Sequence, residues 1–488
     1  MTFEPILSDF NGLFAALAIL VVYAGLLMAA DDLWIDVYFF TTRLSPRRLT
    51  KEDKKRLRLL PQKRIGIMIA NWHEEDVLEQ MISGNVASVD YLNYTFFLGV
   101  YPNDDKTLAI ARQLEARYRE VKVIVNSRPG PTTKGQMLNE VARGILAYES
   151  EQNLKYDLFL MHDSEDVLHP LSLSLINDAA ETHDFVQIPI FSFDVKPSKL
   201  VGGTYLDEFS ESHTKDLLVR EHMGAAIPSA GVGTALSRNF VLSNMSRQNS
   251  DLLREDTLTE DYDLGLNAKA NGFKSTFACA YDVDPEGRWD FIATREFFPD
   301  RLSTAVRQKT RWTLGIVFQG RKNLGWSGDW VDKYFLFRDR RGPINAFLIV
   351  LNALVFISFL ASSLFTREMP EFLSSALFVV PATLNFVNMI YRAFRRAKAV
   401  RRVNGWTHAL LVPLRWPVGN FVNTLAVAKA VQSHLRTLRT GLAPKWDKTA
   451  HVMPEGFGRP TAIPAVARVR PGPAPERTPD PRDIEVNR

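Results

Sequence analysis

An uncharged apolar run of twenty residues near the N-terminus constrains the fold of this chain more than any other feature. Residues 11–30 read NGLFAALAILVVYAGLLMAA, and a helix of that length spans the hydrocarbon core of a bilayer. A cleavable signal peptide would begin with basic residues, but the first ten residues contain Glu4 and Asp9 and neither Lys nor Arg. The run therefore predicts a transmembrane helix rather than a signal peptide.

The charges that flank the apolar runs predict their orientation. Ten Lys or Arg and only two acids lie in 43–64, and basic residues mark the cytosolic side of a membrane. This places the N-terminus outside and the following domain in the cytosol. Two more apolar runs, 344–365 and 372–391, carry basic residues on their outer flanks, which predicts a hairpin that enters and leaves on the cytosolic side. A buried helical hairpin in a soluble protein is the alternative.

The C-terminal part is less regular. The segment 407–433 contains Pro413, Arg415 and Pro417, and both proline and a charged side chain disfavour an ordinary transmembrane helix. We expect broken interfacial or re-entrant helices there, with a fourth span as the alternative. A proline-rich composition after Pro454 predicts a disordered tail. The expected domains are an N-terminal transmembrane helix (1–42), a cytosolic domain (43–335), transmembrane and interfacial helices (336–450) and the tail (451–488).

Strand-like runs alternate with helical runs through the cytosolic domain. The runs 64–70, 94–101, 122–127 and 157–166 are rich in apolar residues, and a helical pattern follows each of the first three. Such alternation predicts an α/β fold with an open, mainly parallel sheet, in which ligands bind beyond the carboxyl ends of the strands. Polar clusters occur at three of those ends. The net charge of +4 over 488 residues gives no signal for a nucleic-acid partner, and the single cysteine, Cys279, excludes an intrachain disulfide.

The order of four motifs resembles one enzyme family. Acidic residues end the fourth strand (MHDSED), and SAGVGTA, TED and QKTRW follow at 229–235, 259–261 and 308–312. This order is similar to that of the family 2 glycosyltransferases, the group that includes cellulose and hyaluronan synthases, which have a GT-A fold. The runs YPNDDKT, MHDSEDVLHP and KWDKTAH (445–451) resemble more closely the phage-adsorption branch of that family. The resemblance covers about residues 60–450.

The resemblance implies roles for four acids. Asp163 and Glu165 match the family's acidic DxD pair, which would hold Mg²⁺ or Mn²⁺ against the diphosphate of a nucleotide sugar. Glu165 departs from the family's second Asp. Asp261 would be the general base of an inverting transfer, and Glu260 would orient it. Without QKTRW downstream, Thr259 and these acids would be read as a helix cap.

The resemblance implies further binding residues, and each also has an ordinary structural explanation. A Lys can be a solvated surface residue, and a Gly can serve close packing alone. Arg311 offers bidentate hydrogen bonds to a diphosphate, and the indole of Trp312 offers a surface for a sugar. The expected nucleotide and donor contacts are Asn71, Glu74, Asp104, Lys134, Gln308 and Arg311, and the expected acceptor contacts are Trp312, Gly231 and Gly233.

The expected function is therefore inverting sugar transfer from a nucleotide-sugar donor, with a UDP-sugar first, in a bacterial inner membrane. The acceptor is expected to be a growing polysaccharide, made processively and exported, with an outer-membrane export protein as a further partner. One alternative is the transfer of a single sugar to a polyprenyl phosphate or another acceptor. Another is a phage-receptor or secretion component that retains a catalytically inactive glycosyltransferase fold.

Overall fold

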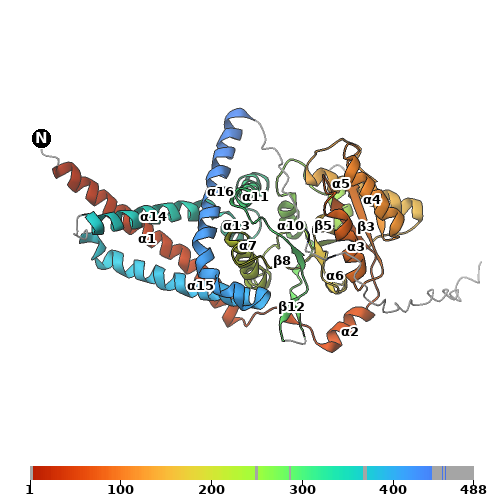
Figure 1. Ribbon diagram of the computed structural model, residues 1–488, viewed down its shortest axis with the longest axis horizontal. Helices are drawn as coiled ribbons and strands as arrows, with labels where there is room; N and C mark the ends of the chain where they lie inside the picture. The colour runs from red at the N-terminus through yellow and green to blue at the C-terminus, as the bar shows by residue number, and fades with distance from the viewer. Residues whose placement is uncertain are drawn as a thin grey trace, which may run out of the picture.

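The chain folds into an α/β domain from which long helices extend to one side (Figure 1). The computed structural model describes residues 4–247, 251–284, 287–365 and 371–441, together with Met453 and Phe457. The long helices are α1 (Glu4–Thr41), α14 (Gly342–Phe365) and α15 (Ala376–Leu410). Of the predicted disordered tail, 451–488, all but Met453 and Phe457 lies outside the described residues.

A seven-stranded sheet is the centre of the α/β domain. Its spatial order is β10 (Ser275–Phe277), β7 (Phe185–Gln187), β9 (Thr234–Ser237), β5 (Leu158–His162), β2 (Ile65–Ala70), β3 (Tyr94–Val100) and β4 (Val121–Val125). Strand β9 runs antiparallel to β5 and β7, and all other neighbours are parallel. The predicted α/β fold with a mainly parallel sheet is confirmed. The fourth predicted strand ends earlier than expected, because the residues after His162 form a turn.

Alternation along β2 explains how both faces of the sheet are covered. Ile65, Ile67 and Ile69 pack in one core cluster with helices α3 (Leu78–Ser88) and α4 (Asp105–Arg117). Met68 points to the opposite face and packs in a second cluster with α5 (Lys134–Gln152). Successive side chains of a strand face opposite sides, so the continuous apolar run of β2 is typical of a strand covered by helices on both faces.

Two small sheets and the remaining helices complete the described part of the chain. The sheets are β1 (Arg47–Arg48), β11 (Ala280–Val283) and β12 (Trp289–Phe291), and β6 (Val167–Leu168), β13 (Thr294–Glu296) and β8 (Ile190–Ser192). The other helices are α2 (Lys51–Leu59), α6 (Ser172–Ala179), α7 (Leu200–Glu211), η1 (Ser212–Asp216), α8 (Leu217–His222), α9 (Arg238–Arg247), α10 (Glu260–Ala270), α11 (Leu302–Thr313), η2 (Leu314–Gln319), α12 (Gly320–Leu324), α13 (Trp330–Arg340), η3 (Glu371–Leu373) and α16 (Val412–Thr440).

Among the described residues, two helical segments are long and apolar enough to cross a membrane. They are Phe14–Thr41 in α1 and Ala376–Leu410, which is α15. The bent pair of α13 and the first part of α14, Gly342–Ser358, forms a third if it counts as one span. Helices α1, α14 and α15 contain the predicted spans 11–30 and 344–365 and most of 372–391. These segments fit a membrane protein.

Ion pairs join the long helices to the α/β domain. On α1, Asp31, Asp32 and Asp36 follow the apolar run directly, and their partners come from α13, from the residue between α13 and α14, from η1 and from α15. The pairs are Asp31 and Asp32 with Arg338 and Arg341, Asp36 with Lys215, and Glu211 with Lys215, Arg392 and Arg396. The acids after the first apolar run are thus used inside the protein.

Helix α16 corrects one expectation. The chain turns at Gly405, which has a φ of 82°, and again at Leu411, and α16 then continues unbroken past Pro417. Pro413 lies in the first turn of α16, where a backbone N–H has no helical partner in any case. Arg415 is buried and binds both carboxylate oxygens of Asp207, at 2.6 and 3.0 Å. The expected break within 407–433 is present at Leu411, but it precedes the prolines, which are therefore not its cause, and the charge of Arg415 is neutralised within the protein.

Candidate active site

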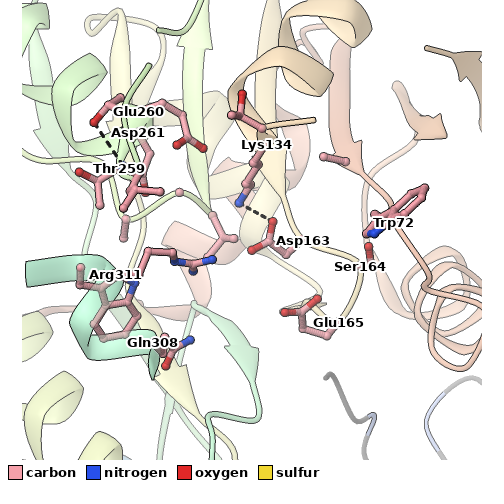
Figure 2. A pocket seen from close by; sticks show the side chains of 18 of the residues that line it. Trp72, Lys134, Asp163, Ser164, Glu165, Thr259, Glu260, Asp261, Gln308 and Arg311 are labelled. Carbon is pink, nitrogen blue, oxygen red and sulfur yellow. Dashed lines mark hydrogen bonds and ion pairs between the residues drawn. The ribbon is translucent and has the colours of Figure 1, made fainter. Parts of the chain in front are cut away.

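A cavity of about 280 Å³ lies beyond the carboxyl ends of β2 and β5. Its walls come from segments that are far apart in the sequence, and Figure 2 shows their side chains turned toward a common space. The predicted site residues that line it are Asn71, Glu74, Lys134, Asp163, Glu165, Gly231, Glu260, Asp261, Gln308, Arg311 and Trp312. The parallel sheet therefore brings these eleven residues together where a ligand is expected.

Two predicted site residues are absent from the described lining of this cavity. Asp104 is buried and caps α4, since its carboxylate accepts hydrogen bonds from the backbone N–H groups of Thr107 and His73, the latter at 2.7 Å. Gly233 has a φ of +60°, and a Cβ there would lie 2.8 Å from Ile188. Its N–H donates to the carbonyl of Met161. Both residues thus have a structural role beside the cavity.

The turn after β5 separates the acids of the MHDSED motif. Asp166 is fully buried, and its Oδ2 accepts from the ring of His162 at 2.7 Å and from the N–H of Asp163 at 2.8 Å. Asp163 and Glu165 both line the cavity. Ser164, between them, donates its hydroxyl to the side-chain oxygen of Asn71. Asp166 therefore shapes the turn, and the carboxylates two positions apart reach the ligand space.

Asn71 also has structural partners. Its amide nitrogen donates to the carbonyls of Gly99, at 3.0 Å, and Ile69, and its oxygen accepts from Ser164. The residue has no exposed surface. Its side chain therefore fixes the ends of three strands relative to one another, whatever contact it makes with a ligand.

The TED motif does not cap a helix through its threonine. Helix α10 begins at Glu260, but Thr259 makes no side-chain capping hydrogen bond, and its hydroxyl is buried against Gly315. A Cβ on Gly315 would approach that hydroxyl to 2.3 Å. Glu260 and Asp261 line the cavity. The geometry thus removes the capping explanation for Thr259 and leaves the two acids facing the ligand space.

Gly231 lies directly beside Asp261. Its φ is +81°, and a Cβ at this position would lie 2.5 Å from Asp261 Oδ2 and 3.7 Å from Lys134 Nζ. A positive φ and the absence of a side chain are both properties that glycine supplies. The glycine of the SAGVGTA motif therefore allows the backbone to approach the carboxylate of Asp261.

The two acids of TED share an environment that disfavours their charged forms. Burial, together with the charge of Asp261, raises the pKa of Glu260 to about 7. Burial also raises the pKa of Asp261, although Lys134 and Arg311 act in the opposite direction. Burial lowers the pKa of Lys134, but the charges of Asp163 and Glu260 outweigh that effect and raise it. Lys134 is therefore positively charged, and its Nζ lies 2.5 Å from Asp163 Oδ1. The neighbouring carboxyl pair takes up a proton near neutral pH.

We predict that Glu260→Gln stabilises the protein at pH 8. Because the pKa of Glu260 is higher in the folded than in the unfolded chain, the folded state binds the proton more tightly. The free energy of unfolding therefore decreases as pH rises from about 4.5 to about 7. A neutral Gln does not lose a proton, so the variant should have a free energy of unfolding on the order of 1–3 kcal/mol higher than wild type at pH 8. Thermal unfolding midpoints at pH 5 and pH 8 measure the effect. Glu255→Gln, which changes another acid of the cavity lining, should keep the wild-type pH dependence. An unchanged pH dependence in Glu260→Gln would contradict the prediction.

The QKTRW motif lies at the end of α11, as the helical pattern predicts. The helix widens directly afterwards into the π-helical segment η2, a feature often found at functional sites. Among the described residues, Gln308 Oε1 and Arg311 Nε are buried without a hydrogen-bond partner. Trp312 lies edge-on to Tyr205 and Phe209, with ring centroids 6.1 and 6.3 Å apart. Its ring is thus partly used in packing, whereas Gln308 and Arg311 hold unused polar atoms at the cavity.

Sequence reasoning missed several lining residues. Gln319, in η2, lines the cavity, and its Oε1 accepts from the N–H of Leu258 at 2.8 Å, which ties η2 to the TED loop. The other unpredicted lining residues with polar or aromatic side chains are Trp72, Tyr101, Thr132, Thr133, Ser164, Glu255, Asp256, Thr257, Thr259, Glu296, Phe297 and Phe298. Apart from Ser164 in MHDSED and Thr259 in TED, these residues lie outside the four motifs, because their contribution depends on the packing of distant segments. Trp72 alone, next to Asn71, could have been inferred from its place after the first strand.

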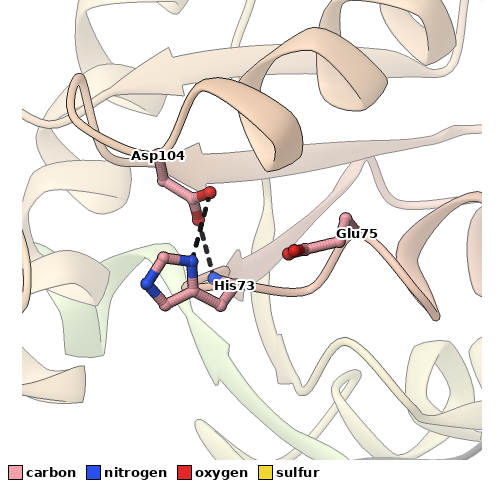
Figure 3. Close-up of side chains that lie close together, drawn as sticks. All are labelled: His73, Glu75 and Asp104. Carbon is pink, nitrogen blue, oxygen red and sulfur yellow. Dashed lines mark hydrogen bonds and ion pairs between the residues drawn. The ribbon is translucent and has the colours of Figure 1, made fainter.

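A second acidic group lies outside the described cavity lining. His73, Glu75 and Asp104 each offer a ligand atom within 4.8 Å of the others (Figure 3), and the ring Nδ1 of His73 is 3.5 Å from Asp104 Oδ1. Sequence reasoning gave His73 no metal role. It is the one group of three potential metal-ligating residues found among the described residues. Its carboxylates already have protein partners, since Asp104 caps α4 and Glu75 pairs with Lys106 at 3.6 Å.

Comparison with known proteins identifies the class. Residues 61–315 match the model of the family described as glycosyltransferase like family 2. The fold is similar to that of a mannosyltransferase from Pyrobaculum calidifontis, solved in complex with GDP-Man and Mn²⁺, with a TM-score of 0.53, 12% sequence identity, and coverage of 86% of this chain and 99% of that one. The chain belongs to family 2 of the glycosyltransferases, and the expected GT-A fold is confirmed.

Two curated relatives are more similar in sequence. They are bacteriophage adsorption protein B of Escherichia coli strain K12 and bacteriophage N4 adsorption protein B of Escherichia coli O157:H7. Each is 36% identical over 469 residues, which covers 91% of this chain. The chain spans 62% of the length of these relatives. The closer resemblance to the phage-adsorption branch is thereby confirmed.

Proposed function

We propose that the chain is a membrane-bound inverting glycosyltransferase that uses a nucleotide-sugar donor, with UDP-sugars as the first class to test. One observation carries the proposal. A single cavity combines an acid pair after β5, the acid pair of α10 and the unpaired polar atoms of Gln308 and Arg311. These are the groups that a sugar transfer needs, namely a base for the acceptor and stabilisation for the leaving diphosphate.

The charge of the cavity supports a requirement for a divalent cation. Among its described lining residues the cations are Lys134 and Arg311, and the acids are Glu74, Asp163, Glu165, Glu255, Asp256, Glu260, Asp261 and Glu296. A diphosphate would meet net repulsion there. Mg²⁺ or Mn²⁺ prefers carboxylate oxygens as ligands, and Asp163 and Glu165 are the residues that would hold it. The cation would neutralise the charge that develops on the leaving diphosphate.

Metal removal gives the second prediction. Chelation with EDTA should stop nucleotide release from the donor, and Mn²⁺ or Mg²⁺ should restore it. Loss of a residue that supports a metal ligand weakens metal binding roughly 10–100-fold. Asp163→Asn, which removes a proposed ligand itself, should raise the metal concentration for half-maximal activity by at least as much. Glu165→Asp, which restores the family's usual pair, should remain close to wild type. Equal activity with and without EDTA would contradict the metal assignment.

The protein groups then have distinct tasks in the transfer. Asp261 takes the proton from the acceptor hydroxyl as that oxygen attacks the anomeric carbon, and the bond to the diphosphate breaks on the opposite face of the sugar. Glu260 holds Asp261 in place and sets its proton affinity. Lys134 and Arg311 bind the diphosphate as it departs, and Trp312 and Gly231 line the acceptor side. The donor side would be completed by Asn71, Glu74 and Gln308. Asp104 and Gly233 would support it through the local structure beside the cavity.

The product is proposed to be a polysaccharide, made processively and passed outward. Support comes from the chain path, because α11 continues through η2 and α12 into α13 and α14, which belong to the candidate membrane helices. The inner-membrane location, with a cytosolic α/β domain and an external N-terminus, rests on the basic residues of 43–64. An outer-membrane export protein would then be a partner.

The test is an assay of membrane vesicles with a panel of labelled UDP- and GDP-sugars, using wild type and Asp261→Asn. Long products that vanish in the variant support processive synthesis. A single sugar that is extractable with lipid would instead indicate transfer to a polyprenyl phosphate. If neither wild type nor variant releases nucleotide from any donor in a metal-dependent way, the proposed transferase activity is rejected. A receptor or secretion role for a catalytically inactive fold would then remain.

A further inference from the structure

Three cations lie along one face of α15, just beyond its apolar part. Arg395, Lys398 and Arg402 follow one another at spacings of three and four residues, so their side chains neighbour each other on the helix surface. None of them forms an ion pair within 4 Å in the described part of the chain, and Arg395 Nε is buried there without a hydrogen-bond partner. By contrast, Arg392 and Arg396 of the same helix both pair with Glu211.

The three cations surround a small cavity between α1 and α15. It measures about 40 Å³, and Phe39 and Phe40 of α1 form its apolar side. The guanidinium of Arg395 lies over the ring of Phe40 at 4.0 Å. The cavity is large enough for about three waters, which is the scale of one phosphate group.

The cavity holds one acid, Glu211, whose charge is already compensated. Glu211 forms ion pairs with Lys215 at 2.9 Å, Arg392 at 2.9 Å and Arg396 at 2.7 Å. Lys215, which also lines the cavity, binds Asp36 at 2.7 Å. The charges of Arg395, Lys398 and Arg402 are therefore left without a counterion in the described structure, and an anion would complete the set.

The outer face of α1 is apolar at the level of this cavity. Leu33, Trp34, Val37 and Phe40 are 42–50% exposed, although they follow the apolar run 11–30, while the acids of the same turns point into the protein. A helix at the membrane surface is expected to have one face of apolar side chains and an opposite face of charged side chains. On α1 the charged side chains are the acids that form ion pairs inside the protein. Aromatic residues are enriched at this level of membrane proteins.

We propose that the cavity binds the phosphate of an anionic membrane phospholipid. Arg395, Lys398 and Arg402 contact the headgroup through charge-assisted hydrogen bonds, and the acyl chains lie along the exposed apolar side chains of α1 and α15. The proposal rests on the placement of these helices in a bilayer and not on the reaction catalysed. Its failure and the failure of the proposed function are therefore separate results.

The full-length protein is placed in nanodiscs that contain equal amounts of phosphatidylglycerol and phosphatidylcholine. Native mass spectrometry then counts the lipids that stay bound to the protein after it is released from the nanodisc. Wild type should retain phosphatidylglycerol in preference. Arg395→Gln/Lys398→Gln should weaken that preference about 30-fold, since each basic residue near a membrane surface contributes roughly a fivefold factor. The matched control is Lys51→Gln/Lys55→Gln, which removes two exposed cations from α2.

Each outcome decides the proposal. Loss of the preference in the α15 variant alone, with an unchanged thermal unfolding midpoint, supports the site. Equal loss in both variants indicates a general effect of net charge and overturns it. Displacement of the lipid by millimolar inorganic phosphate shows a site for free anions and also overturns it. If the double variant unfolds, Arg402→Gln alone, which removes the cation at the far end of the set, replaces it in the same measurement.

Discussion

Asp261→Asn is expected to lower the rate of sugar transfer about 10²–10⁴-fold, the usual contribution of a general base. The side chain keeps its size beside Gly231 but can no longer accept the acceptor's proton. Because donor contacts are assigned to other residues, the KM for the donor should change little. Since the base must be ionised, and burial raises the pKa of both acids, wild-type activity should fall as pH is lowered, and this fall should begin at a higher pH than for a carboxyl group with its ordinary pKa. Rates across pH 5.5–9 with a saturating donor measure both effects.

A matched control lies two residues further along the same helix. Asp263 is also buried in the first turn of α10, but it binds the side chain of Asn323 at 2.9 Å and does not contribute to the described cavity lining. Asp263→Asn should therefore keep near-wild-type transfer and the same pH profile. If Asp263→Asn loses as much activity as Asp261→Asn, the effect belongs to the helix start and Asp261 is not the base.

Arg311→Ala is expected to cost about 10²–10³-fold in kcat, as does removal of a donor that stabilises a developing negative charge. Arg311 Nε has no hydrogen-bond partner in the described structure, so the guanidinium is available to the departing diphosphate. Arg311→Lys should recover only part of the rate, because an ammonium keeps the charge but lacks the planar pair of donors. Steady-state kinetics with varied donor concentration separate kcat from KM.

The control for this substitution is Arg307, one turn earlier on α11. Its side chain is exposed and it does not line the cavity. Arg307→Ala should leave kcat within a factor of about two, because surface substitutions seldom change stability by more than about 0.5 kcal/mol. A large and equal loss of kcat in both variants would show that the substitutions disturb α11 itself. The proposed role of Arg311 at the diphosphate would then be rejected.

The fold was largely predictable because its signals are local. The apolar run of β2 and the polar residues that follow it identify a strand with its ligand end, and the long uncharged runs identify the long apolar helices. The antiparallel strand β9 was not predicted, since pairing order depends on contacts between distant segments. The path of α16 was mispredicted for a related reason. Pro417 and Arg415 look incompatible with a continuous helix until Asp207, on α7, is placed beside them.

The site was predictable where several motifs constrain one another. TED alone indicates a helix cap, and only its order before QKTRW gives the acids a chemical role. The structure supports that order by placing Thr259 against Gly315, without a cap, and Asp261 against Gly231. Asp104 and Gly233 show the limit, because a residue within a motif can serve the local structure and lie outside the described cavity lining. Gln319 could not have been found, since its contact with Leu258 depends on the extra residue in the turn of η2.

The ion pairs between α1 and the rest of the protein have a mechanical consequence. Asp31, Asp32 and Asp36 connect α1 to α13, to Arg341 directly after α13, to η1 and to α15, and separating such partly buried pairs costs several kcal/mol. The α/β domain is therefore held to α1 by many contacts and not by a flexible linker. If α1 crosses a membrane as we propose, these contacts would keep the cavity at one distance from the bilayer, and only an acceptor whose hydroxyl group lies at that distance would be used.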